Sequence, residues 1–165
     1  MPKRESIERV LPCLLDRLSD DHPKQGNEGR NERVISLSRY KEGVLRDLRW
    51  LFNSMAHIDG EPITEDEILA SSVLNYGLRN LSGLVADSID VEAYRRHIVD
   101  CLKKFEPRLN PNTIEVRLIQ DPEKSGKGVP TLHFEISGEL WARPVPERFL
   151  ARTEMDLETG ECIVV

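Results

Sequence analysis

Residues 90–118, "DVEAYRRHIVDCLKKFEPRLNPNTIEVRL", change their hydrophobic period from that of a helix to that of a strand. The apolar residues before Pro107 recur every three or four positions, which predicts a helix. Pro107 ends this helix because the residue before a proline disfavours helical backbone angles. After the proline, apolar residues alternate with polar ones, which predicts a strand. Glu106 and Arg108 flank the proline, and this pair could serve catalysis, a structural ion pair or the binding of another protein.

The sequence on either side of this junction follows the same division. Towards the N-terminus, "SLSRYKEGVLRDLRWLFNS" predicts a long amphipathic helix with Ser38 as its N-cap. The stretch "TEDE", residues 64–67, has the form of a capping box and predicts a short helix that ends near Gly77. Towards the C-terminus, alternating patterns predict further strands at residues 131–140, 147–158 and 162–165.

These elements predict an α+β fold in which N-terminal helices pack on one face of a small, mostly antiparallel sheet formed by the C-terminal half. Residues 1–34 are predicted to be a partly flexible segment with a short helix that begins near Pro12, because residues 19–32 contain almost no apolar side chains. Residues 35–165 are predicted to form a single domain.

Composition argues against several functional classes. The net charge of −6 is unlike the basic excess of a dedicated nucleic-acid-binding domain. No apolar run approaches the roughly 20 residues that a membrane-spanning helix needs, and no secretory signal is present, so we expect a cytoplasmic protein. The three cysteines, Cys13, Cys101 and Cys162, lie far apart in the sequence, which predicts reduced thiols rather than a disulfide or zinc site.

No catalytic pattern is present. The chain has no GxSxG motif, its four histidines lack metal-ligand spacing, and "SGKG" lacks the spacing of a phosphate-binding loop. Glu135 and Glu139 fall on the polar side of a predicted strand, where a carboxylate is ordinarily solvated. We therefore predict that the protein is not an enzyme and has no catalytic residues, metal ligands or cofactor.

The C-terminal residues 161–165, "ECIVV", include four successive apolar side chains. Such a strand is either central and buried or an edge strand that another chain completes by strand addition. The pattern leaves both interpretations open, and the strand at Phe149–Leu157 is an alternative open edge.

Five segments, "LLDRLSDD", "RYKEGVLRDLRWLFN", "SVLNYGLRNLSG", "FEPRL" and "ARTEMDLETGE", occur in an order that resembles the TssE family. TssE is a baseplate subunit of the bacterial type VI secretion system and belongs with the small wedge proteins of contractile phage tails, often labelled lysozyme-like. The resemblance extends from about Leu11 to Glu161. In that family a Glu-Pro-Arg triplet is implicated in baseplate assembly, so the resemblance implies that Glu106, Pro107 and Arg108 bind a partner.

The resemblance also implies the neighbours of the protein. These are TssF, TssG and TssK, in a baseplate on the cytoplasmic side of a membrane complex, and the TssB/TssC sheath, which would start to grow on this subunit by strand pairing at an open sheet edge. Under this hypothesis, Arg108→Ala leaves the isolated chain folded and abolishes assembly with TssF and TssG. The alternatives are a cytosolic adaptor or regulatory protein on the same fold and a peptidoglycan hydrolase. The 5 % aromatic content disfavours the hydrolase, because few aromatic side chains are available to line a sugar-binding cleft.

Overall fold

The computed structural model describes Val10 and residues 12–19, 35–57, 65–84, 89–119, 131–142 and 145–165. The predicted linker, from residue 20 onwards, lies outside the described residues, as does Thr64 of the predicted capping box.

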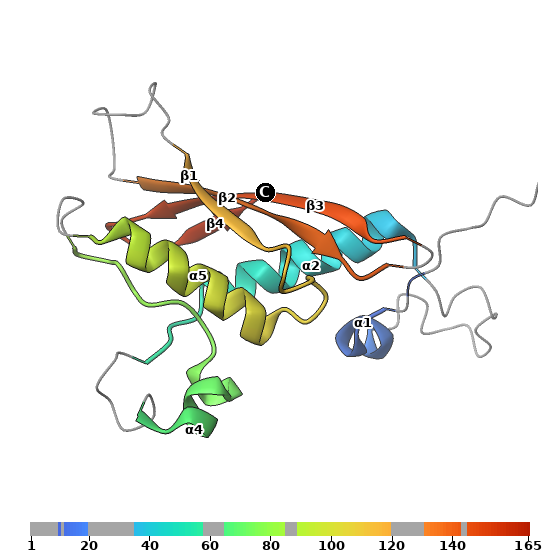
Figure 1. Ribbon diagram of the computed structural model, residues 1–165, viewed down its shortest axis with the longest axis horizontal. Helices are drawn as coiled ribbons and strands as arrows, with labels where there is room; N and C mark the ends of the chain where they lie inside the picture. Colours follow the sequence, from blue (N-terminus) through green and yellow to red (C-terminus); the bar gives the residue numbers. More distant parts are fainter. Residues whose placement is uncertain are drawn as a thin grey trace, which may run out of the picture.

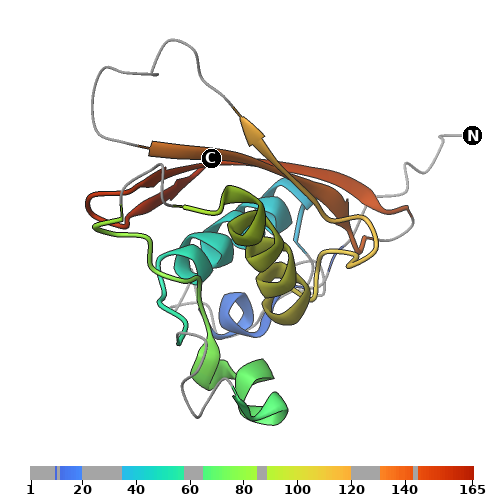
Figure 2. The ribbon, with the colours of Figure 1, turned by 60° about the vertical axis from the view of Figure 1, so that its left-hand side comes forward.

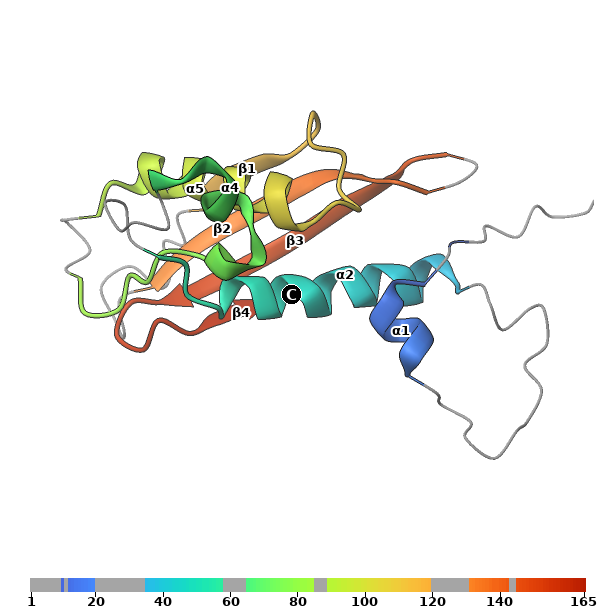
Figure 3. The ribbon, with the colours of Figure 1, turned by 90° about the horizontal axis from the view of Figure 1, so that it is seen from below.

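The helices lie in the N-terminal two thirds of the chain, and two of them cover one face of the sheet (Figures 1 and 2). No described helix covers the outer face of the sheet. The short helix α1 lies on the side of α2 and α5 that faces away from the sheet, towards one end of the molecule. The short helix α4, with the 3-10 turn that follows it, lies on the same side towards the other end (Figures 1 and 3). The helical elements are α1 (Leu14–Leu18), α2 (Leu37–Phe52), α4 (Glu67–Ser71), the 3-10 turn η1 (Val73–Asn75) and α5 (Val91–Phe105).

The strands form one antiparallel sheet in the order β1-β2-β3-β4, in which each strand pairs with its sequence neighbours. They are β1 (Glu115–Ile119), β2 (Thr131–Leu140), β3 (Glu147–Asp156) and β4 (Cys162–Val164). This arrangement confirms the predicted α+β fold, with helices on one face of an antiparallel sheet. The C-terminal strand β4 is an edge strand, so the central alternative is wrong.

The core forms between the inner face of the sheet and the apolar stripes of α2 and α5. Along β3 the predicted alternation holds at each expected position, because its inward side chains are all buried: Phe149, Ala151, Thr153 and Met155, followed by Leu157. From the helices, Val44, Leu48 and Leu102 are fully buried against this face.

One predicted helix start is wrong by two residues. α2 begins at Leu37, and its cap is Ser36 rather than Ser38, since the Ser36 hydroxyl accepts a hydrogen bond from the N–H of Arg39 at 3.3 Å. α4 is capped by Asp66, whose carboxylate accepts from two backbone N–H groups. The predicted capping-box residue, Thr64, lies outside the described residues, so that prediction is not tested. In each case a nearby polar side chain with suitable geometry takes the cap.

Candidate partner-binding site

The acid and the base of the triplet at residues 106–108 face each other inside the molecule. α5 ends at Phe105, and Glu106, the residue that follows, is 3 % exposed. Nε of Arg108 donates to Oε1 of Glu106 at 2.6 Å, and Nη2 donates to the other carboxylate oxygen. The N–H of Leu109 donates to the Glu106 carbonyl, which closes the turn through the exposed Pro107. The triplet is therefore an internal ion pair on a constrained turn.

Further charges extend this pair across three helices. Nη2 of Arg108 also donates to Oδ2 of Asp47 in α2 at 2.7 Å. Nε of Arg46 donates to the second oxygen of Asp47 at 2.9 Å, and Nη1 of Arg46 donates to Asp16 in α1. We call these five side chains, Glu106, Arg108, Asp47, Arg46 and Asp16, the charge network. Its signs alternate along the chain of contacts, so it joins the end of α5 to α2 and α1.

The pKa values in the charge network favour permanently charged groups. Burial opposes the charge of Arg108, but its hydrogen bond to Glu106 and the charges of Glu106 and Asp47 outweigh burial and raise its pKa. The hydrogen bond to Asp16 raises the pKa of Arg46. Burial acts to raise the pKa of Asp16, but hydrogen bonds from Cys13 and Arg46 outweigh it and lower this pKa. These three groups therefore hold their charge at neutral pH, as a structural network requires.

The internal pairing changes the expectation for Arg108→Ala. Removing this guanidinium would leave the Glu106 carboxylate buried without its main partner, which costs about 3–5 kcal/mol. If this variant failed to assemble, the failure could come from unfolding or from lost binding, and the experiment would not distinguish the two.

A groove of about 310 Å³ lies beside the charge network. Its walls include Leu15 of α1, Trp50 of α2, and Tyr76 and Phe105, whose rings meet edge to face with centroids 5.2 Å apart. Trp50 is 51 % exposed, and the Arg46 guanidinium lies over its ring at 5.2 Å. Exposed aromatic rings beside ordered arginines are typical of the residues that dominate protein–protein binding.

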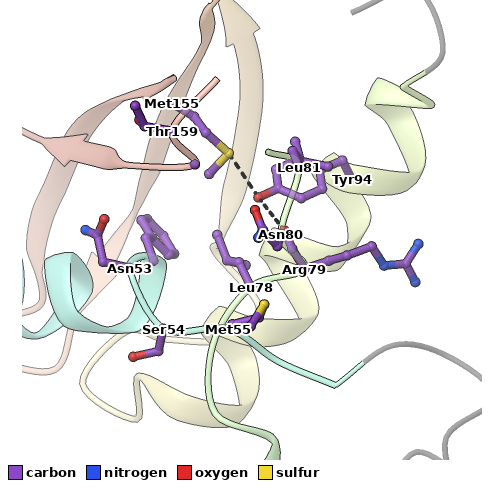
Figure 4. Close-up of a pocket in the computed structure, with 12 residues that line it drawn as sticks. Asn53, Ser54, Met55, Leu78, Arg79, Asn80, Leu81, Tyr94, Met155 and Thr159 are labelled. Carbon is purple, nitrogen blue, oxygen red and sulfur yellow. Dashed lines mark hydrogen bonds between the residues drawn. The ribbon is translucent and has the colours of Figure 1, made fainter. Parts of the chain in front are cut away.

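A second hollow, of about 200 Å³, lies between the end of α2 and α5 (Figure 4). The Tyr94 hydroxyl lies close to Sδ of Met155 at 3.1 Å and to the Arg79 carbonyl at 3.3 Å. Burial raises the pKa of Tyr94, so its hydroxyl stays protonated. The described lining of this hollow contains no carboxylate, histidine or cysteine, so it offers no acid–base pair.

The sheet margin at β4 is closed by the side chains of Arg49 in α2 and of Asn53, the residue that follows α2. The amide of Asn53 pairs with Cys162 as a neighbouring strand would: its Nδ2 donates to the Cys162 carbonyl at 2.8 Å, and its Oδ1 accepts from the Cys162 N–H at 2.9 Å. Nε of Arg49 donates to the Val164 carbonyl at 3.0 Å. We call this the closed margin. An added strand would have to displace these side chains.

The direction of the backbone groups locates the margins that remain open. Arg152 and Val165 exchange both backbone hydrogen bonds, at 2.7 and 2.9 Å. Because these directions alternate along an antiparallel strand, the N–H and C=O groups of Leu150 and Arg148 also point to this side, beyond the end of β4. No described strand pairs with them there.

The backbone N–H and C=O groups of β1, at the other side of the sheet, also alternate in direction. The register of β3 with β2 and of β2 with β1 shows which residues of β1 point outward. The N–H and C=O groups of Val116 and Leu118 point away from β2, and no other strand of the described chain lies beyond β1. We call β1 and the first half of β3 the open margins. No strand of the described chain pairs with their outward backbone groups, which are of the kind that strand addition uses.

A comparison with known protein families matches residues 38–145 to the family described as baseplate wedge protein gp25. The chain belongs to this family. The match spans α2, the lobe formed by α4 and η1, α5, the triplet and the first two strands. Neither curated proteins nor solved structures give a match.

TssE is a member of the gp25 baseplate wedge family, so the resemblance seen in the sequence is confirmed at family level. Membership indicates a structural role in a baseplate of the kind found in contractile phage tails. Among the described residues, no helix is both long enough and apolar enough to cross a membrane.

The structure of this gp25-family chain brings the three predicted site residues together and adds partners that the sequence pattern did not indicate. Arg46 and Asp47 are neighbouring charged residues of α2, and nothing in the local sequence indicates that they contact the triplet or its partners. Asn53 follows the last residue of α2, where an Asn is an ordinary helix-ending residue. The only available signal was its polar character at the end of an amphipathic helix.

Proposed function

We propose that this gp25-family chain acts as the TssE subunit of a type VI secretion baseplate. It joins TssF and TssG into a wedge, adjoins TssK, and starts the TssB/TssC sheath at the cytoplasmic face of the inner membrane. The observation that carries the proposal is the contrast between the open margins, at β1 and the first half of β3, and the closed margin at β4. A subunit that templates a strand-paired sheath needs an available backbone margin, and a closed margin at β4 limits pairing with other chains there.

The groove beside the charge network supports binding to TssF and TssG. Pro107 is exposed at its rim, and the ion pair of Glu106 and Arg108 holds the turn that presents this proline. In this proposal the triplet contributes mainly by shaping the groove, while Trp50 supplies exposed aromatic surface for the partner.

The open margins support sheath initiation. Leu118 of β1 and Leu150 of β3 mark two backbone segments with which a strand of a sheath subunit can pair. Backbone hydrogen bonds define the register of such a strand, and repeated contacts around a ring of subunits require a defined register.

The test compares Trp50→Ala with Trp141→Ala in co-purification with TssF and TssG. Both tryptophans are about half exposed, 51 % and 54 %, but only Trp50 lines the groove. Neither substitution leaves a buried charge unpaired, so both variants should keep the circular dichroism spectrum and melting temperature of the parent chain.

We expect Trp50→Ala to lose TssF and TssG and Trp141→Ala to retain them. If Trp50→Ala retains both partners, the groove is not the wedge-binding site. A parent chain that recovers no baseplate or sheath protein would overturn the proposed function and favour the cytosolic adaptor. Clearing of cell-wall material by the purified chain in a zymogram would instead revive the hydrolase.

A further inference from the structure

The lobe formed by α4 and η1, residues 65–75, projects from the body on the side away from the sheet (Figures 1 and 2). Its apolar side chains turn outward rather than into a core, and none of the residues of α4 or η1 is buried. Their exposed fractions are 79 % for Ile68, 38 % for Leu69, 79 % for Val73 and 62 % for Leu74. Neighbouring exposed apolar side chains of this kind mark binding surfaces.

A helix of five residues is too short to be stable without tertiary contacts, so the lobe must be held by the body. The side chain of Asn75 does this. Its Oδ1 accepts from the N–H of His57 at 2.8 Å, and its Nδ2 donates to the Ala70 carbonyl at 3.1 Å. One amide therefore ties the lobe both to the segment after α2 and to its own helix.

The glycine that follows makes the second anchor. The N–H of Leu78 donates to the Ser54 carbonyl at 2.9 Å, and the N–H of Ala56 donates to the Leu78 carbonyl at 3.0 Å. Gly77 has φ 131°, and a Cβ atom there would lie 2.2 Å from the Ser54 carbonyl oxygen. Gly77 thus allows a close approach to Ser54 that a side chain would prevent, and this approach adds to the anchoring by Asn75. A surface held in this way loses little conformational entropy on binding.

The charges of the lobe indicate the chemistry of its partner. Glu65, Asp66 and Glu67 stand beside the apolar side chains, and residues 65–75 contain no lysine or arginine. The Asp66 carboxylate caps α4, whereas the side chains of Glu65 and Glu67 belong to exposed residues. A second copy of this lobe would bring like charges together, which opposes self-association.

We propose that the α4–η1 lobe is a second docking surface, which inserts into an apolar hollow bordered by lysine or arginine side chains on the TssF–TssG wedge. This inference rests on the proposed function. The lobe surface differs from the groove beside the charge network in location and in mechanism, because binding at the lobe requires neither Trp50 nor the triplet.

The test measures the affinity of the full chain for purified TssF–TssG complex. We expect Ile68→Ser/Val73→Ser to weaken binding roughly 10- to 100-fold through lost apolar burial. The matched control, Val145→Ser/Ile163→Ser, changes two exposed apolar residues, 67 % and 55 % exposed, away from the lobe. Its affinity should stay within about twofold of the parent chain.

A charge-reversal variant, Glu65→Lys/Glu67→Lys, tests the partner chemistry without removing apolar surface. It should also weaken binding, and its affinity should fall less steeply with added salt than that of the parent chain, because the attraction between lobe and partner is lost. This second variant keeps the test decisive if the serine variant alters the fold of the lobe.

The outcomes separate the inference from the function on which it rests. Parent-like affinity in both lobe variants, together with a loss of binding in Trp50→Ala, overturns the lobe inference and leaves the proposed function standing. A parent chain that does not bind TssF–TssG overturns both. A parent chain that is a dimer in solution, and a monomer after Ile68→Ser/Val73→Ser, overturns the inference in favour of self-association.

Discussion

The two edge strands of the sheet differ in what lies beside them. At β4, the side chains of Asn53 and Arg49 hydrogen-bond to backbone groups that a further strand would otherwise use. At β1, the corresponding groups of Val116 and Leu118 have no strand beside them in the described chain. An edge strand is therefore not automatically a docking strand. An edge strand is available only if no packed helix places hydrogen-bonding side chains against its outward backbone groups.

The largest effect is expected from proline substitutions that remove a backbone N–H from an open margin. Leu118→Pro and Leu150→Pro each remove an N–H with which no strand of the described chain pairs, and proline is tolerated at such edge positions. Either variant should fold, and the one at the true docking margin should fail to start TssB/TssC sheath, as measured by electron microscopy of reconstituted assemblies.

Leu118→Ala and Leu150→Ala are the matched controls, because they shorten the side chains and keep the backbone donors. Normal sheath growth in both proline variants would mean that neither margin templates the sheath. A defect in only one of them would identify that margin as the docking strand.

Asn53→Ala should open the closed margin and lower the free energy of unfolding by about 2–4 kcal/mol, since it leaves both backbone groups of Cys162 without a partner. Arg49→Ala removes one hydrogen bond, to the Val164 carbonyl, and should lower the free energy of unfolding by about 1 kcal/mol. Urea denaturation measures both. Equal stability of Asn53→Ala and the parent chain would show that β4 does not depend on this cap.

The smallest effect concerns the thiol within the closed margin. Burial raises the pKa of Cys162 to about 12, and that of Cys101 also to about 12. Because these folded-state values lie above the ordinary value of 9.0, their contribution to stability is complete below pH 9 and is lost as the pH rises towards 12. A buried, protonated thiol reacts slowly with disulfide reagents.

At pH 8 we therefore expect slow modification of Cys162 in the parent chain and faster modification in Asn53→Ala, followed by mass spectrometry of the labelled peptides. Rapid labelling of Cys162 in the parent chain would contradict a closed margin at β4.

The sequence by itself determined the identity and the burial pattern of the elements. The period change at Pro107 placed the helix and the strand on either side correctly, and the alternation at residues 149–157 identified the buried side chains of β3. These predictions succeed because each depends on which side of a single element meets the core, and that choice is encoded in residues a few positions apart.

Only the tertiary structure decided how the proposed binding surfaces are made. Asn53 lies 109 positions from Cys162, and Arg108 lies 61 positions from Asp47, so no local pattern relates either pair. The sequence showed that the triplet is charged and that the C-terminal strand is apolar. Packing decided that Glu106 and Arg108 form an internal ion pair and that the margin at β4 is closed. The hydrogen bonds from Arg108 to Asp47 and between Asn53 and Cys162 join groups that are distant in the sequence, so they form only when the helices pack against the sheet.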